Sequence, residues 1–126
     1  MTDIFSLTTN ELVVQLREGQ ISSVEVCTKY IERIKKFEKD VKAWAHFDKK
    51  ELLEKAAEAD EFRKTGKPLG PLHGLPVAIK DIIGTLDMPT ECGTIIRKKM
   101  TGSQEAEVVN LLKIAGAIIM GKTETT

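Results

Sequence analysis

The chain has 126 residues, of which 41% are hydrophobic and 30% charged, and its 19 basic side chains balance 19 acidic ones, a composition typical of a globular protein. The zero net charge argues against direct nucleic-acid binding, which favours a basic surface, and no apolar run is long enough to form a transmembrane helix. The two cysteines are too few for a disulfide framework and the N-terminus shows no signal pattern, so we predict a cytoplasmic protein.

Two helices are predicted near the N-terminus, and each opens on a capping box. Thr8 with Glu11, and Ser22 with Glu25, have the spacing at which a hydroxyl and a carboxylate satisfy the free amides of a helix start. The second helix has an apolar stripe at three- and four-residue steps that includes Cys27. We interpret this cysteine as a core residue rather than as a nucleophile.

The middle of the chain continues this helical pattern. Residues 41–47 form either a short strand or an extended linker, and a third helix is predicted between Asp48 and Gly66. We therefore expect residues 1–66 to be mainly helical and residues 67–126 to form strand, loop, helix and strand.

The second half of the chain predicts one βαβ unit. Residues 75–79 are apolar on both faces, which is typical of a strand covered on both sides. A helix over residues 104–115, with Ser103 as its N-cap and Val108 and Leu111 among its buried positions, leads to a second apolar strand at 117–120. The irregular segment 82–100 is long for a loop, and such loops are usually functional.

A lysine follows each of these strands. Parallel strands joined by a helix end on the same edge of the sheet, where ligands bind in open α/β folds, so Lys80 and Lys122 are expected there together. A desolvated lysine has a lowered pKa and can act as a base, although on spacing alone a solvent-exposed strand-end lysine is the more common case. We interpret Lys122 as a lysine with its ammonium group in water, and Asp81 as structural.

Other candidate sites are weaker. Residues 116–123 match the pattern of a phosphate-binding loop, but the middle residues are apolar and form the strand itself, so we predict no nucleotide binding. The histidines His46 and His73 and the cysteines have no metal-ligand spacing, so no metal site is predicted. We expect His73 to be structural and leave Cys92, in a probable cleft loop, as an unassigned candidate for a reactive thiol.

Three segments stand in order along the second half of the chain: residues 70–81 (GPLHGLPVAIKD), 87–94 (DMPTECGT) and 115–123 (AGAIIMGKT). Together they resemble the amidase signature family, and the resemblance covers essentially the whole chain. It implies that residues 1–126 are the N-terminal portion of a single amidase domain, incomplete at its C-terminus. The implied fold is α/β, with helices layered on a mixed sheet.

The resemblance also implies a chemistry. Members of this family are carbon–nitrogen hydrolases that form an acyl-enzyme through a Ser–cis-Ser–Lys triad. By resemblance Lys80 is the base of that triad, which requires a buried amine at the floor of a cleft. The serines of the family lie in a Gly/Ser-rich segment beyond residue 126, so we expect the isolated chain to be inactive. No cofactor is implied, and the partner of the complete enzyme is a small-molecule amide.

Two alternatives remain open from the sequence. The glutaminase subunit of glutamyl-tRNA(Gln) amidotransferase carries the same motifs as simple amidases. A truncated, non-catalytic chain that serves as an interaction fragment is the other alternative. In either case an exposed apolar edge or face favours self-association or binding to partner subunits.

Overall fold

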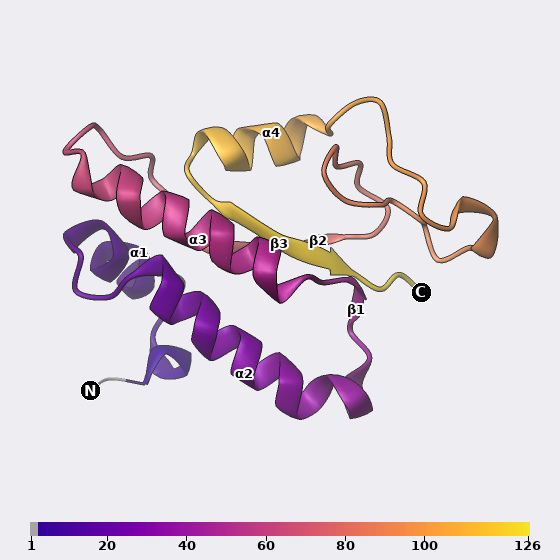
Figure 1. Ribbon diagram of the computed structural model, residues 1–126, viewed down its shortest axis with the longest axis horizontal. Helices are drawn as coiled ribbons and strands as arrows, with labels where there is room; N and C mark the ends of the chain where they lie inside the picture. Colours follow the sequence, from indigo (N-terminus) through magenta and orange to yellow (C-terminus); the bar gives the residue numbers. More distant parts are fainter. Residues whose placement is uncertain (1–2) are drawn as a thin grey trace.

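A computed structural model of the chain describes residues 3–126 and shows a mixed α/β fold, as the sequence predicts (Figure 1). None of the helices in this part of the chain is both long and apolar enough to cross a membrane. The helices and strands, in chain order, are η1 (Ile4–Ser6), α1 (Thr9–Glu18), α2 (Ser23–Val41), β1 (Trp44–His46), α3 (Lys49–Lys64), β2 (Pro76–Lys80), η2 (Ile95–Arg97), α4 (Glu107–Ile114) and β3 (Ile118–Thr123).

Local sequence determines where the first helices begin. At α1, Thr8 Oγ1 accepts a hydrogen bond from the Glu11 amide at 3.3 Å, and the Glu11 carboxylate accepts one from the Thr8 amide at 2.7 Å. Ser22 and Glu25 form the same reciprocal pair at α2, and the carboxylate of Asp48 caps α3. The predicted capping boxes are therefore confirmed.

The sheet has the strand order β1-β3-β2. β2 and β3 are parallel and joined by α4, which confirms the βαβ unit, and β1 runs antiparallel along the other side of β3. Of the two alternatives for residues 41–47, the short strand is the one present. A Cβ atom on Gly121 would lie 2.6 Å from the carbonyl oxygen of His46, so the approach of β1 to β3 requires a glycine there.

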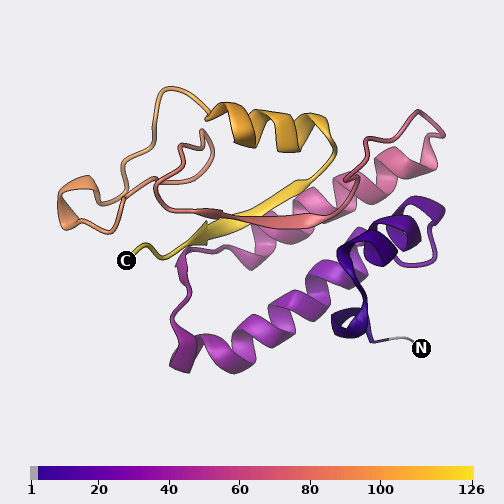
Figure 2. The ribbon, with the colours of Figure 1, turned by 180° about the vertical axis from the view of Figure 1, so that it is seen from behind.

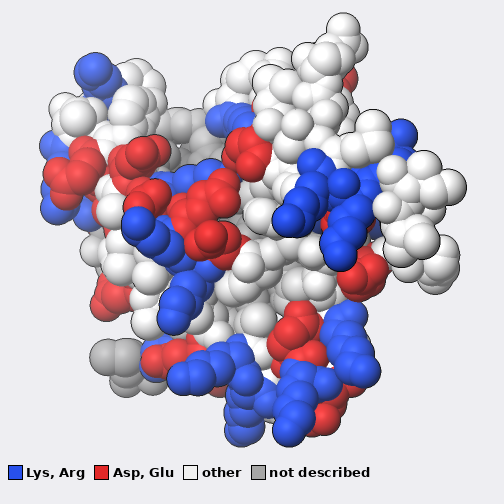
Figure 3. Space-filling model, turned by 45° about the vertical axis from the view of Figure 1, so that its right-hand side comes forward, with Lys and Arg blue, Asp and Glu red and all other residues white. Residues whose placement is uncertain are grey.

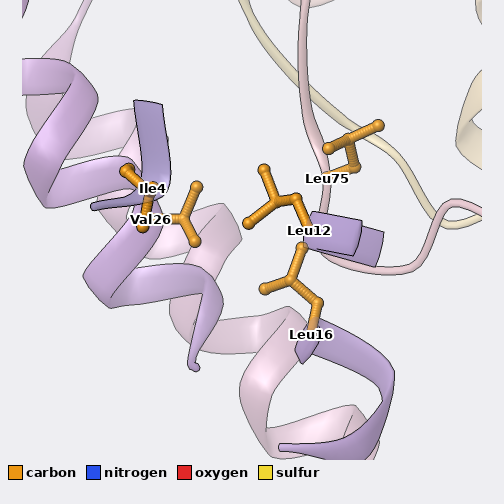
Figure 4. Packing of buried hydrophobic residues seen from close by; sticks show 5 residues of the cluster. All are labelled: Ile4, Leu12, Leu16, Val26 and Leu75. Carbon is orange, nitrogen blue, oxygen red and sulfur yellow. The ribbon is translucent and has the colours of Figure 1, made fainter. Parts of the chain in front are cut away.

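Helices cover the sheet from two sides. In Figures 1 and 2, α4 lies on one face of the sheet, and α2 and α3 lie on the other. Ile118 and Met120 of β3 pack against α2 and α3, whereas Ile119 packs with Val109 of α4. A third cluster joins the N-terminal elements to the chain just before β2 (Figure 4), and its buried members are Ile4, Leu12, Leu16, Val26 and Leu75. Alternate side chains of β3 therefore pack against the helices on opposite faces of the sheet.

The prediction for α4 is wrong in two respects. The helix begins at Glu107, and its N-cap is Ala106, which makes no side-chain hydrogen bond, so Ser103 is not the cap. Val109 is fully buried, but Val108 and Leu111 are about half exposed. The Ala106 amide donates to the Gly84 carbonyl at 3.0 Å and Ala106 has an extended backbone, so the helix begins only after this residue.

The expectation that β2 is covered on both faces is also wrong. Ile79 is buried, yet Ala78 and Lys80 are exposed. β2 is an edge strand, and α2 and α3 pack against β3. The apolar run in the sequence therefore marks a strand with one covered face in this structure.

Candidate functional site at the carboxyl end of the parallel strands

Lys80 is the last residue of β2 and lies opposite Thr123 of β3. Its side chain projects from the same face as that of Ala78, because alternate residues of a strand share a face, and both are exposed. The structure places Lys80 at the expected edge of the sheet. It places the amine in an exposed setting rather than in the buried one expected of a catalytic base.

Lys122 is the lysine that is buried at this edge, and its predicted exposure to water is wrong. Its side chain has 0% exposure. The ammonium group donates hydrogen bonds to the Pro89 carbonyl at 3.0 Å and to Thr90 Oγ1 at 2.7 Å, and lies 3.7 Å from Asp81 Oδ1. Burial lowers the pKa of Lys122, and the Asp81 carboxylate opposes that change.

The strand register explains why the two lysines differ. Lys122 lies opposite Ile79, which belongs to the cluster beneath α4, whereas Lys80 lies opposite Thr123. The register shifts between Val77 and Ala78, where β3 has one extra residue, so Lys122 shares the α4 side of the sheet with Ile79 although Ile118 and Met120 face α2 and α3. Lys80 projects from the opposite face of β2, where its side chain is exposed. The sequence around the two lysines does not reveal this difference, because each lysine follows an apolar run.

Asp81 fixes the exit of β2. Its backbone amide donates to the Thr123 carbonyl and its backbone carbonyl accepts from the Cys92 amide, both at 2.9 Å. Its carboxylate accepts from the Glu91 amide at 3.1 Å and pairs with Lys122. The structural role predicted for this residue agrees with these contacts, since they join both parallel strands to the following loop.

The irregular segment 82–100 folds back toward these strand ends. Within this segment Met88 is buried in the cluster that contains Ile79 and Val109, and the Thr90 amide donates to the Met100 carbonyl at 2.8 Å. Cys92 is partly buried and has a left-handed backbone with φ of 54°, next to Gly93 with φ of 72°. The bend at these two residues turns the chain away from Asp81 toward η2.

A cleft of about 240 Å³ lies beside this bend. It is lined by Ala45, Asp81, Glu91, Gly93, Thr94, Ile95, Lys98 and Glu124. A larger cleft of about 590 Å³ lies between α3 and α4, where Phe62, His73 and Gly116 are among its lining residues. His73 and Gly116 precede β2 and β3, so the larger cleft is at the amino end of the strands, opposite the predicted site. The smaller cleft is the one adjacent to the β2 exit.

The remaining candidate side chains serve the fold. His73 Nε2 donates to the Ala59 carbonyl at 2.9 Å, which confirms its structural interpretation. Cys27 is fully buried, and burial raises the pKa of its thiol to about 12, so it is a core residue as predicted. No group of His, Cys, Asp and Glu residues suited to hold a metal ion occurs within residues 3–126.

Charged side chains are interleaved on the surface. Lys55 lies 2.8 Å from Asp87 and 3.0 Å from Glu51, and Lys113 lies 2.9 Å from Glu105. Figure 3 shows positive and negative side chains intermixed on one face of the molecule. These pairs belong to α3, α4 and the loop between β2 and α4, so they hold the loop against both helical layers.

The chain matches known proteins over nearly all of its length. A family model described as Amidase matches residues 25–126. The A subunit of glutamyl-tRNA(Gln) amidotransferase from Rhodopirellula baltica is 40% identical over 114 residues, which are 90% of this chain and 23% of that protein. Its counterpart from Natranaerobius thermophilus is 40% identical over 120 residues, covering 95% of this chain and 24% of that protein.

Solved structures show the same arrangement. The native peptide amidase of Stenotrophomonas maltophilia superposes with a TM-score of 0.83 at 29% identity, over 94% of this chain and 24% of that one. A fatty acid amide hydrolase superposes with a TM-score of 0.87 at 26% identity, over 95% of this chain and 21% of that one. The chain thus spans about a quarter of the length of the relatives it matches.

Proposed function

The chain belongs to the amidase family, and on that premise we propose that it is the N-terminal portion of a single amidase domain. The complete protein hydrolyses the carbon–nitrogen bond of a carboxamide through an acyl-enzyme, with Lys80 as the base. The observation that carries this proposal is the position of Lys80, at the carboxyl end of a parallel strand and directly before Asp81, which lines the smaller cleft. Residues 1–126 would then supply the base and part of the cleft wall, whereas both serines would come from beyond residue 126.

The role of Lys80 is to hold and release one proton. Its neutral amine takes a proton from the relay serine, which in turn takes one from the nucleophilic serine as that oxygen attacks the amide carbon. The amine must be neutral near neutral pH for this purpose. The face of β2 with Ala78 and Lys80 is open here, and a layer of protein over that face would remove the amine from water, and burial disfavours the charged form of an amine.

Two substrate classes are consistent with this chemistry. The curated relatives at 40% identity are A subunits of an amidotransferase, which favours a glutaminase that works with partner subunits. The structural relatives include a peptide amidase and a fatty acid amide hydrolase, which favour a simple amidase. We infer a cytoplasmic enzyme with no cofactor and no direct contact with nucleic acid. The isolated chain is inactive in this account, because the members of a catalytic triad act as a unit.

The proposal can be tested in a chimera. Residues 1–126 replace the matching segment of the Rhodopirellula baltica protein, which is expressed with the other subunits of its amidotransferase, and ammonia release from glutamine and simple amides is measured. Lys80→Ala should reduce the rate by about 10³-fold or more, because the serine then has no base. Lys29→Ala is the control, since Lys29 is an exposed α2 residue paired with Glu32.

Two results would contradict the proposal. One is a Lys80→Ala chimera that keeps its activity to within a few-fold. The other is a chimera with Lys80 intact that assembles with the other subunits and yet releases no ammonia.

A further inference from the structure

The chain around η2 forms an arm, residues 91–99, whose two ends meet. The Thr90 amide donates to the Met100 carbonyl at 2.8 Å, so the chain leaves and returns at one point, as in an Ω-loop. The arm projects beyond the strand ends in Figures 1 and 2, and none of its residues is buried. The contacts at its base therefore decide where the arm lies.

The arm forms one wall of the smaller cleft, which has a volume of about 240 Å³. The lining residues from the arm are Glu91, Gly93, Thr94, Ile95 and Lys98, whereas Ala45, Asp81 and Glu124 come from β1 and from the exits of β2 and β3. A shift of the arm relative to the strand ends would therefore change the width of this cleft.

Thr90 is the residue at which the contacts of the base converge, and it is 5% exposed. Its amide bonds to Met100, its carbonyl accepts a hydrogen bond from Arg97 Nε at 3.4 Å, and its hydroxyl accepts one from the Lys122 ammonium at 2.7 Å. Lys122 is completely buried and donates a second hydrogen bond to the Pro89 carbonyl at 3.0 Å. Thr90 thus connects the arm to a buried lysine of β3.

Asp81 holds the end of the arm that leaves the base. Its carbonyl accepts the Cys92 amide at 2.9 Å, and its Oδ1 atom accepts the Glu91 amide at 3.1 Å. The same Oδ1 atom lies 3.7 Å from the Lys122 ammonium. One buried ammonium group therefore supports both anchors of the arm.

We propose that Lys122 is a positioning residue for the cleft wall and acts through Thr90. Its ammonium group holds the base of the arm in one place relative to the strand ends, and so sets the width of the cleft that receives the substrate of the complete enzyme. That the cleft receives the substrate rests on the proposed function, whereas the support of the arm rests on the contacts alone.

The first test is amide hydrogen exchange in this chain with Thr90→Val, which keeps the shape of the side chain and removes the acceptor. The Cys92 and Lys99 amides bond to the Asp81 carbonyl and the Glu91 carboxylate, so their protection reports opening of the arm. Both should exchange about tenfold faster, because the bond from a charged donor is lost. Thr90→Ser keeps the hydroxyl and is the matched control, with an expected change of less than about twofold.

Two kinds of amide separate support of the arm from general stability. The arm amides exchange when the arm alone opens and respond to the bonds that hold it, whereas the Ile118 amide, bonded to the Leu75 carbonyl at 2.8 Å, exchanges when the whole chain unfolds. Lys55→Met is the second control, since Lys55 holds Asp87, which lies before the arm. It should speed exchange at Ile118 and leave the arm amides unchanged.

The second test uses the chimera with the Rhodopirellula baltica protein. Thr90→Val should raise the KM for glutamine by about three- to tenfold and change kcat by less than about twofold, because the cleft wall contributes to binding and not to proton transfer. Thr90→Ser should keep the KM of the unmodified chimera. A merely structural loss would reduce the amount of assembled enzyme and leave its KM unchanged.

Either of two results would overturn the inference. One is a Thr90→Val chain in which Ile118 loses protection and the arm amides do not. The other is an active Thr90→Val chimera whose KM is that of the unmodified chimera. The exchange measurement needs no catalysis, so it tests the support of the arm even if the unmodified chimera is inactive, a result that would contradict the proposed function instead.

Discussion

Lys122 has the largest fully buried side chain among the described residues. An ammonium group loses its hydration on burial, and the fold offsets this loss with two hydrogen bonds and one carboxylate. The compensation is incomplete, because burial still lowers the pKa of this lysine. This residue therefore makes the stability of the chain depend on pH.

We expect this dependence to favour the folded chain at high pH. Between the lowered native pKa of Lys122 and its ordinary value of 10.5, the unfolded chain binds the proton that the folded chain has released. The free energy of unfolding therefore gains a favourable contribution as the pH rises through that window. Urea unfolding at several pH values should show the wild type gaining stability relative to a Lys122→Met, Asp81→Asn double variant.

The double variant is the proper reference because it lacks both charges and leaves no unpaired carboxylate. The titration of the other lysines is common to both chains and cancels. A stability difference that stays constant up to pH 10.5, or that falls, would contradict the lowered pKa.

The burial and role of a residue can be predicted from the sequence where they depend mainly on its neighbours along the chain. Cys27 lies on a helical stripe and His73 in a tight loop, and the sequence predicts the setting of both correctly. Lys80 and Lys122 look alike in the sequence, since each ends an apolar run. The two side chains differ in burial because of the strand register and because α4 covers only one face of β2. Both are tertiary properties, which a local sequence pattern does not contain.

Helix starts show the same contrast at the scale of elements. α1 and α2 begin where their capping boxes predict, because both partners of each box lie within one turn. α4 begins three residues later than Ser103 allows, because the bond from Ala106 to Gly84 holds the preceding chain away from helical geometry. The sequence predicts where the irregular segment 82–100 begins and ends. Its path in space depends on contacts with Asp81 and Lys122, which the sequence does not reveal.

Matched serine variants test this interpretation. Ser22 Oγ accepts the Glu25 amide at 3.0 Å, so Ser22→Ala should lower the free energy of unfolding by about 0.5–2 kcal/mol. Ser103→Ala should change it by less than about 0.5 kcal/mol, because the exposed Ser103 does not cap α4. Urea midpoints at an unchanged slope give both values. Equal losses for the two variants would show that α4 starts at Ser103 after all.

The whole molecule leaves apolar surface uncovered. Ile95 is 90% exposed and Ile96 86%, and α4 adds Val108, Leu111 and Ile114, each at least half exposed. The outer face of β2 is open as well. Relatives about four times as long as this chain have further protein to place against such surfaces, which fits the proposal that residues 1–126 are one portion of an amidase domain. The prediction of self-association follows from the same exposure.

The central proposal is that residues 1–126 are the N-terminal portion of an amidase domain whose serines lie further along the protein, and the most direct measurement is the DNA sequence of the source past codon 126. The account predicts that the reading frame continues and encodes a Gly/Ser-rich segment that holds both serines. A stop codon directly after Thr126 would contradict the proposal, because the protein would then lack the serines that the proposed mechanism needs.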